Sequence, residues 1–188
     1  MLDLEPIQRL KKTLELFNLY LDEAQKCRHA GAPLAGSVLL ASAMEAALLA
    51  MVQCFPGEVG RVVARYKSKE LSRPASEWGL SQLLLIARTL GWLPSAGNPE
   101  DRLDPQKAGI GDYVEVIRAI RNLVHPSIYL RECPDKSISE AHLDLSFRVL
   151  EEACAHFSRA LSEADASGRP GHTTPVPSVP SIGKAGPA

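Results

Sequence analysis

The polar side chains best suited to chemistry gather in one short segment, residues 113–126. At the rotation of about 100° per residue of an α-helix, one face of this segment carries Glu115, Arg118, Arg121, Asn122 and His125. Arg118, Arg121 and Asn122 stand three, four or seven positions before His125, so their side chains can meet on one helical surface. The residues expected to pack in the core are Tyr113, Val116, Ile117, Ile120, Leu123 and Val124.

This combination of side chains suits phosphate chemistry. Two guanidinium groups beside an imidazole disfavour its charged form, which would keep part of His125 neutral near pH 7. Each guanidinium also offers a planar, permanently charged fork to phosphate oxygens. Metal-free RNA cleavage needs a base that takes the proton of a 2′-hydroxyl and donors that stabilise the charged transition state. The pattern therefore predicts His125 as the base, with Arg118, Arg121 and Asn122 as ligands of the phosphate. DNA has no 2′-hydroxyl and would not react in this way.

Glu45 is a second unusual polar residue, because it interrupts an otherwise apolar stretch, residues 38–52. A buried, unpaired carboxylate is costly and should either protonate or find a cation. Arg118 or Arg121 is the expected partner, so Glu45 is predicted to support the site by orienting an arginine, and Glu115 lies on the same face as that arginine.

Structural explanations compete with each of these assignments. A stripe of arginine, asparagine and histidine is also typical of a solvated helix face. His125, which precedes Pro126, also fits a helix C-terminal cap, and Glu45 with an arginine fits a purely structural pair. The histidines lack metal-ligand spacing, and no phosphate-binding glycine loop is present. We therefore expect neither a metal nor a cofactor.

Composition sets the fold class. The chain has 188 residues, of which 45% are hydrophobic, 23% charged and only 5% aromatic. Sparse aromatic and β-branched residues argue against a β-sandwich, and helical periodicity predicts an all-α, four- to five-helix up-and-down bundle over residues 1–166. Residues 167–188 contain five prolines and four glycines, which predicts a disordered tail.

The helices are expected in a definite order. The first begins near Pro6 and ends before Gly31, and the second covers about residues 34–55. A short amphipathic piece follows at 58–66, then a helix capped by Ser76, a loop at 94–105 and a helix from its cap Asp112 to about Val124. A second loop at 127–136 leads to a last helix that starts near Ser139.

Charge and targeting signals limit the binding partners and the cellular location that we expect. The net charge of −1 excludes binding of nucleic acid by bulk charge alone. The acidic N-terminus lacks the features of a secretory signal, and the apolar stretch at 38–52 is expected to be a buried helix because Glu45 would be costly in a membrane. Four isolated cysteines fit reduced thiols, so we expect a cytoplasmic protein without membrane contact.

At these residues the sequence resembles the HEPN family (higher eukaryote and prokaryote nucleotide-binding), whose members carry an arginine, four to six residues and a histidine. Arg118 and His125 are separated by six residues, which fits this spacing. Arg121 is followed by the polar Asn122, as the family arginine often is, but it is separated from His125 by only three residues. Either arginine can therefore be the family arginine. The resemblance extends through residues 36–49, 80–92 and the last helix.

The resemblance implies an all-α homodimer in which the arginine and histidine helices of two subunits face each other. It implies a metal-independent endoribonuclease or RNA-binding protein, of the kind found in toxin–antitoxin and phage-defence systems, with an antitoxin or another protein as partner. Other HEPN members are non-catalytic. The alternative is therefore a helical module that binds a nucleotide or a protein partner. In one subgroup a modifiable tyrosine stands two residues after the histidine, a position that Ser127 occupies here.

Overall fold

The chain is all-α throughout the residues that the computed structural model describes, which are 4–66, 68–104, 106–132 and 137–167. These ranges hold seven α-helices, two short 3-10 helices and no strand. The last helix ends at Ala166, and Ser167 caps it. Apart from Ser167, the tail predicted to be disordered lies outside the described residues.

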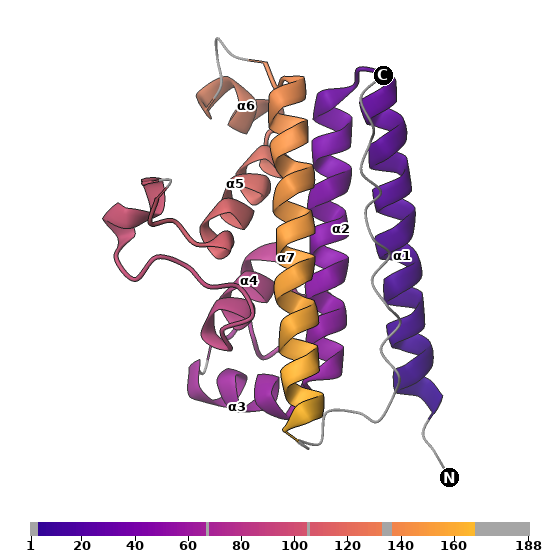
Figure 1. Cartoon of the computed structure of the whole chain (residues 1–188), viewed down its shortest axis with the longest axis vertical. Coiled ribbons are helices and arrows are strands. Elements are labelled where there is room, and N and C mark those ends of the chain that lie inside the picture. The colour runs from indigo at the N-terminus through magenta and orange to yellow at the C-terminus, as the bar shows by residue number, and fades with distance from the viewer. Residues whose placement is uncertain (1–3, 67, 105, 133–136, 168–188) are drawn as a thin grey trace.

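Three long helices form the frame of the molecule: α1 (Leu4–His29), α2 (Pro33–Cys54) and α7 (Glu140–Ala166). Figure 1 shows α1 and α2 antiparallel, with α7 alongside α2 and running in the same direction. Gly31 has a φ of +63° in the turn between α1 and α2, a conformation that glycine adopts without steric cost. The predicted ends of both helices differ from the observed ones by only a few residues.

Helix α2 lies at the centre of the bundle and packs against α1, α4, α5 and α7. Among the described residues it is the one helix long and apolar enough to cross a membrane by length and composition, and 61% of that apolar window is buried in the bundle. Its small residues permit close contacts. A Cβ atom on Gly36 would lie 2.8 Å from Leu143 Cδ1 and 3.2 Å from Cys27 Cβ, so three helices meet closely at this glycine.

Four shorter helices lie on the side of α2 and α7 that faces away from α1 (Figure 1): α3 (Pro56–Tyr66), α4 (Leu80–Thr89), α5 (Ile110–Asn122) and α6 (Pro126–Glu132). The described residues therefore contain more helices than the four or five expected. Helix α6 occupies part of the region predicted to be a loop, because Pro126 stands at the first position of a new helix, where a missing N–H costs nothing.

The two predicted helix caps, Ser76 and Asp112, are both wrong. Ser76 lies in the 3-10 helix η1 (Ala75–Glu77), and Gly79 caps α4 instead, its N–H donating to Gln82 Oε1 at 3.2 Å. Asp112 is the third residue of α5 and accepts the N–H of the true cap, Gly109, at 2.9 Å. The last helix starts near Ser139 as predicted, and Ser139 is the residue that caps α7.

Candidate functional site at the end of helix α5

The rotation of α5 in the bundle differs from the one expected. Val114, Ile117, Ile120 and Leu123 are buried, whereas Val116 and Val124, assigned to the core from sequence, are 44% and 46% exposed. Around the helix axis, Val114 lies on the side of Ile117 where Arg118 and Arg121 stand. The buried face of α5 therefore extends further toward the predicted polar face than expected. As a result, Arg118 and Arg121 lie at the margin of the core and are half-buried.

Arg121 pairs with Glu45, one of the two partners expected from sequence. Arg121 Nη1 lies 2.9 Å from Glu45 Oε2, and the two side chains are 37% and 28% exposed. The contact is an ion pair whose geometry does not align an N–H with Oε2, so this oxygen has no hydrogen-bond partner. Burial raises the pKa of Glu45, and the attraction of Arg121 opposes that rise. The pair joins the middle of α2 to the last turn of α5.

Arg118 belongs to a different network, which sequence reasoning did not find. Its Nε donates to Glu115 Oε2, while Glu115 Oε1 accepts Arg88 Nη1 at 3.0 Å. Arg88 Nη2 also donates to the carbonyl oxygen of Gly111 at 2.6 Å. Glu115 therefore lies between two guanidinium groups, one from α4 and one from α5, and fixes the position of Arg118.

Asp112 anchors the start of α5. Its side chain is only 4% exposed, and Oδ2 accepts the N–H groups of Ala96 and Gly109 at 2.8 and 2.9 Å. Its Oδ1 lies 3.7 Å from Arg102 Nε and 3.8 Å from Arg88 Nη2. A carboxylate at a helix N-terminus is stabilised by the helix dipole, and here it also ties the preceding loop to the helix.

Helix α5 ends earlier than expected, and the chain continues in tight turns to His125. The N–H of His125 donates to the carbonyl oxygen of Asn122 at 3.1 Å, and that of Leu123 to Ile120 at 3.0 Å. Side chains three residues apart eclipse each other in such 3-10 turns, which sets Asn122 and His125 on one side of the chain. The carbonyl oxygen of His125 then accepts the N–H groups of Ile128 and Tyr129, which starts α6.

The structure brings the predicted site residues together only in part. The side chain of His125 is exposed and that of Asn122 is half-buried. Within the described ranges, no hydrogen bond or ion pair joins the His125 ring to Arg118 or Arg121. The two arginines are instead held by carboxylates from different helices. The end of α5 is thus a polar surface on which carboxylates orient the guanidinium groups of Arg118 and Arg121. The accessible imidazole of His125 follows Arg121 by about one turn.

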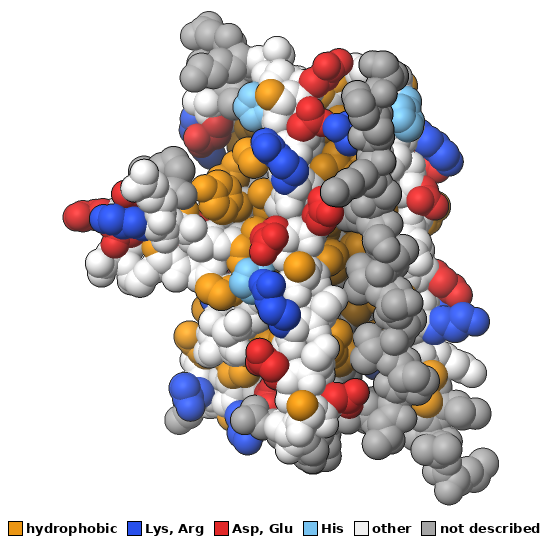
Figure 2. All heavy atoms as spheres, in the orientation of Figure 1, with side chains coloured by type: hydrophobic (Ala, Val, Ile, Leu, Met, Phe, Trp, Pro, Cys, Tyr) orange, Lys and Arg blue, Asp and Glu red, His pale blue; other side chains and the backbone are white. Residues whose placement is uncertain are grey.

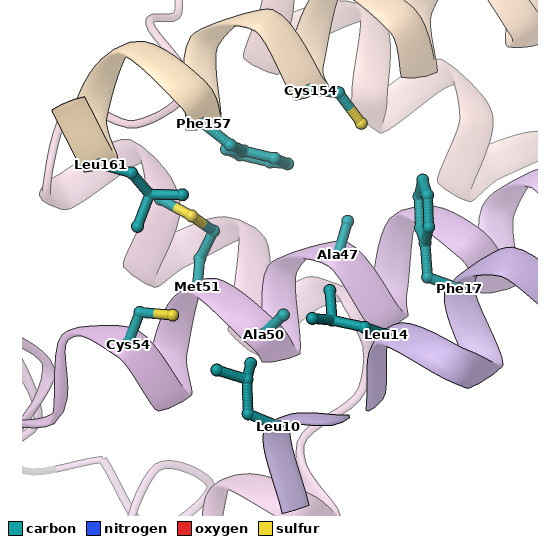
Figure 3. Close-up of a pocket in the computed structure, with 10 residues that line it drawn as sticks. All are labelled: Leu10, Leu14, Phe17, Ala47, Ala50, Met51, Cys54, Cys154, Phe157 and Leu161. Carbon is teal, nitrogen blue, oxygen red and sulfur yellow. The ribbon is translucent and has the colours of Figure 1, made fainter. Parts of the chain in front are cut away.

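Other candidate sites differ in character. In the part of the chain that the structure describes, no three His, Cys, Asp or Glu residues stand close enough together to hold a metal ion. An apolar pocket of about 60 Å³ lies between α1, α2 and α7 (Figure 3), and side chains such as Leu14, Met51 and Phe157 line it. Its lining offers no acid or base for catalysis at neutral pH.

The face of the molecule seen in Figure 2 carries acidic and basic side chains interspersed along α7, without a large patch of one sign. Comparison of the chain with protein-family models, with curated proteins and with solved structures gave no match. What is established is an all-α chain in its described part, with an ion-paired polar surface at the end of α5.

Proposed function

We propose that the end of α5 binds the phosphodiester backbone of single-stranded RNA and that His125 cleaves it without a metal ion. The observation that carries this proposal is the pairing of Arg121 with Glu45 within one turn of the exposed His125. A guanidinium has five N–H groups, so the carboxylate can hold one edge while the remaining N–H groups bind phosphate. An orientation fixed in advance is what electrostatic stabilisation of a transition state requires.

The proposed reaction is an internal transesterification. His125 accepts the proton of the 2′-hydroxyl, and the 2′-oxygen forms a bond to phosphorus as the bond to the 5′-oxygen breaks. The leaving oxygen takes a proton from water, and His125 returns its own proton to solvent. The products are a 2′,3′-cyclic phosphate and a 5′-hydroxyl. Arg118, Arg121 and Asn122 would stabilise the negative charge on the phosphoryl oxygens.

The resemblance to the HEPN family supports the same proposal, since its catalytic members cleave RNA without metal and act as homodimers. It also favours a role in a toxin–antitoxin or phage-defence system, with an antitoxin or another protein as partner. In such a dimer the α5 ends of two subunits would face each other and double the number of guanidinium groups around the RNA.

The test is cleavage of a labelled single-stranded RNA by the purified chain in the presence of EDTA. We expect fragments that end in a 2′,3′-cyclic phosphate and no cleavage of DNA of the same sequence. His125→Ala should lose at least about 100-fold in rate, the lower range for a lost general base. The matched control is His29→Ala, which removes another exposed imidazole and should keep full activity. Equal activity in the two variants would exclude His125 from the mechanism.

The second candidate function is a non-catalytic module that binds a nucleotide or a protein partner at the same surface. The observation that favours it is that the guanidinium groups of Arg118 and Arg121 already have carboxylate partners, while among the described residues no hydrogen bond or ion pair joins the His125 ring to them. Fluorescence anisotropy with labelled RNA and with mononucleotides separates the two candidates. Binding without turnover, weakened several-fold by Arg121→Gln, supports the module. The absence of any binding favours a protein partner.

A further inference from the structure

The pocket between α1, α2 and α7 is apolar, and part of its lining is accessible to solvent (Figure 3). Its volume is about 60 Å³, and the side chains that line it are hydrocarbons and two thiols. A bound water molecule needs about three polar partners, which this lining does not supply. Four of the lining residues are half-buried: Leu10, Leu14, Cys54 and Leu161. The pocket therefore suits an apolar occupant, and it does not depend on the function proposed above.

Two aromatic rings from different helices face this pocket. Phe17 comes from α1 and Phe157 from α7, and both side chains are buried (Figure 3). Along α7 the lining extends from Cys154 to Leu161, a length of about 10 Å at about 1.5 Å per residue. Grooves lined by aromatic rings are the usual binding sites of proline-rich segments in the polyproline II conformation.

The sequence after α7 contains a segment with a matching pattern. Residues 175–182 read Pro-Val-Pro-Ser-Val-Pro-Ser-Ile. Val176, Val179 and Ile182 recur at every third residue, which is the period of a polyproline II helix, so this conformation would place them on one edge. One turn of such a helix rises about 9 Å, close to the length of the pocket. Residues 170–183 contain no Asp, Glu, Lys or Arg, so no charge would be desolvated by binding.

The point at which α7 ends places this segment within reach of the pocket. Helix α7 ends at Ala166, five residues after Leu161, or about 8 Å further along the helix axis. The nine residues from 168 to 176 span at most about 30 Å when extended, which exceeds that distance. Because the segment is covalently attached, its effective concentration at the pocket is in the millimolar range.

We propose that residues 175–182 bind in this pocket as a polyproline II helix, with Val176 near Leu161 and Val179 near Phe157. A polyproline II helix has no internal hydrogen bonds and keeps its backbone solvated, so one apolar edge can be buried while the backbone stays in contact with water. A segment whose composition gives it no core of its own can still become ordered on such a surface.

The experiment measures how fast iodoacetamide modifies Cys54 in the native full-length chain, because this half-buried thiol lines the pocket and the bound segment would cover it. The double variant Val176→Asp with Val179→Asp should react at least five-fold faster, since an unpaired carboxylate is costly in an apolar pocket and would release the segment. The matched control is Ser178→Asp with Ser181→Asp, which adds the same charges on another edge of the polyproline II helix and should leave the rate unchanged.

Peptide mass spectrometry reads each cysteine separately. Cys27, which does not line the pocket, should react at the same rate in all three proteins. Nuclear Overhauser effects between the methyl groups of Val179 and the ring protons of Phe157 are expected in the wild type and not in the valine variant.

Three results would overturn the proposal. The first is an equal rate for Cys54 in the wild type and the valine variant. The second is an equal increase in both double variants, which would mean that added charge and not the lost apolar edge exposes the thiol. The third is protection of Cys54 that persists in the valine variant and grows with protein concentration, which would identify a second copy of the chain as the occupant.

Discussion

Glu45 Oε2 lies 2.9 Å from Arg121 Nη1, so a carboxylate in the middle of the most apolar helix is held by a guanidinium from the last turn of α5. Burial raises the pKa of Glu45 and Arg121 lowers it, with burial the stronger effect. The pair therefore stabilises a charge that the surrounding helices disfavour. The opposing effects of burial and of Arg121 on Glu45 can be measured through the pH dependence of stability.

Glu45→Gln should make the stability of the folded chain less dependent on pH. The raised pKa of Glu45 means that the folded state holds a proton at pH values where the unfolded state has released it. The stabilisation from protonation is complete below the unfolded pKa of about 4.5 and is lost as the pH rises through the folded pKa. Guanidinium unfolding should show that the free energy of unfolding of the wild type declines from pH 4 to pH 8, and that Glu45→Gln reduces this decline. If Glu45→Gln leaves the dependence of the free energy of unfolding on pH unaltered, this expectation is wrong.

Arg121→Gln should destabilise the chain at neutral pH. Without the guanidinium, a half-buried carboxylate loses its partner, at a cost of about 1–2 kcal/mol, reduced because both side chains are partly exposed. The cost should shrink as the pH falls, because Glu45, whose pKa is raised by burial, takes up a proton. The double variant with Glu45→Gln should recover most of the loss, and a double variant no more stable than Arg121→Gln would show that the two residues are not coupled.

Arg88→Ala should be among the more damaging substitutions of a charged residue. It removes one of the two guanidinium partners of Glu115 and the donor to the Gly111 carbonyl oxygen, at a cost of about 2–3 kcal/mol. The control is Arg148→Ala, an exposed position on α7, where a change within about 0.5 kcal/mol is expected. Urea unfolding measures both, and similar values would mean that the network contributes little.

Gly109→Ala should distort the junction between the loop and α5. An added Cβ would lie 2.3 Å from the carbonyl oxygen of Pro94, a backbone atom that cannot move without shifting the loop. We expect a loss of about 2–3 kcal/mol, typical of overpacking. Gly57→Ala is the matched control, because its Cβ would meet no atom within 4 Å inside helix α3. Thermal unfolding should show this variant unchanged or stabilised by about 0.5–1 kcal/mol.

Cys154 should be inert in the folded chain. Burial, with a smaller contribution from Glu151, raises the pKa of its thiol to about 12, and the thiolate is the reactive form. Iodoacetamide at pH 8 should therefore leave Cys154 unmodified in the native protein and modify it readily in guanidinium, as read by peptide mass spectrometry. Cys27, which is half-exposed, serves as the internal comparison. Labelling of Cys154 at the rate seen in guanidinium would show that the pocket in Figure 3 opens frequently.

The long helices could be predicted because their periodicity extends over many turns. The end of the first helix before Gly31 and the start of the last helix near Ser139 have clear local signals, and the structure confirms both. The caps of α4 and α5 were mispredicted because Ser76 and Asp112 are good cap residues by type, whereas glycines occupy the true caps and the contacts come from the third helical residue. Local preference does not distinguish these arrangements.

The candidate site was predictable in composition and less so in geometry. Sequence narrowed the partner of Glu45 to Arg118 or Arg121, and the structure selects Arg121. The contact of Arg88 with Glu115 joins residues 27 positions apart on different helices, and no period or spacing signals such a pair. The exposure of Val116 depends on the rotation of α5 about its own axis, and the packing of α5 against α2 and α7 sets that rotation. The catalytic roles of His125, Arg118, Arg121 and Asn122 stay predictions.

The central place of α2 has a consequence for how this protein can change over generations. Because α2 packs against α1, α3, α4, α5 and α7, a larger side chain at Gly36, Ala41 or Ala43 has no free direction in which to relax. Helix α6 has no buried residue and faces no such restriction. In a library of random substitutions selected for folding, α2 should keep its small residues while α6 accumulates variation. New binding specificities would therefore arise most easily on the segment that directly follows His125.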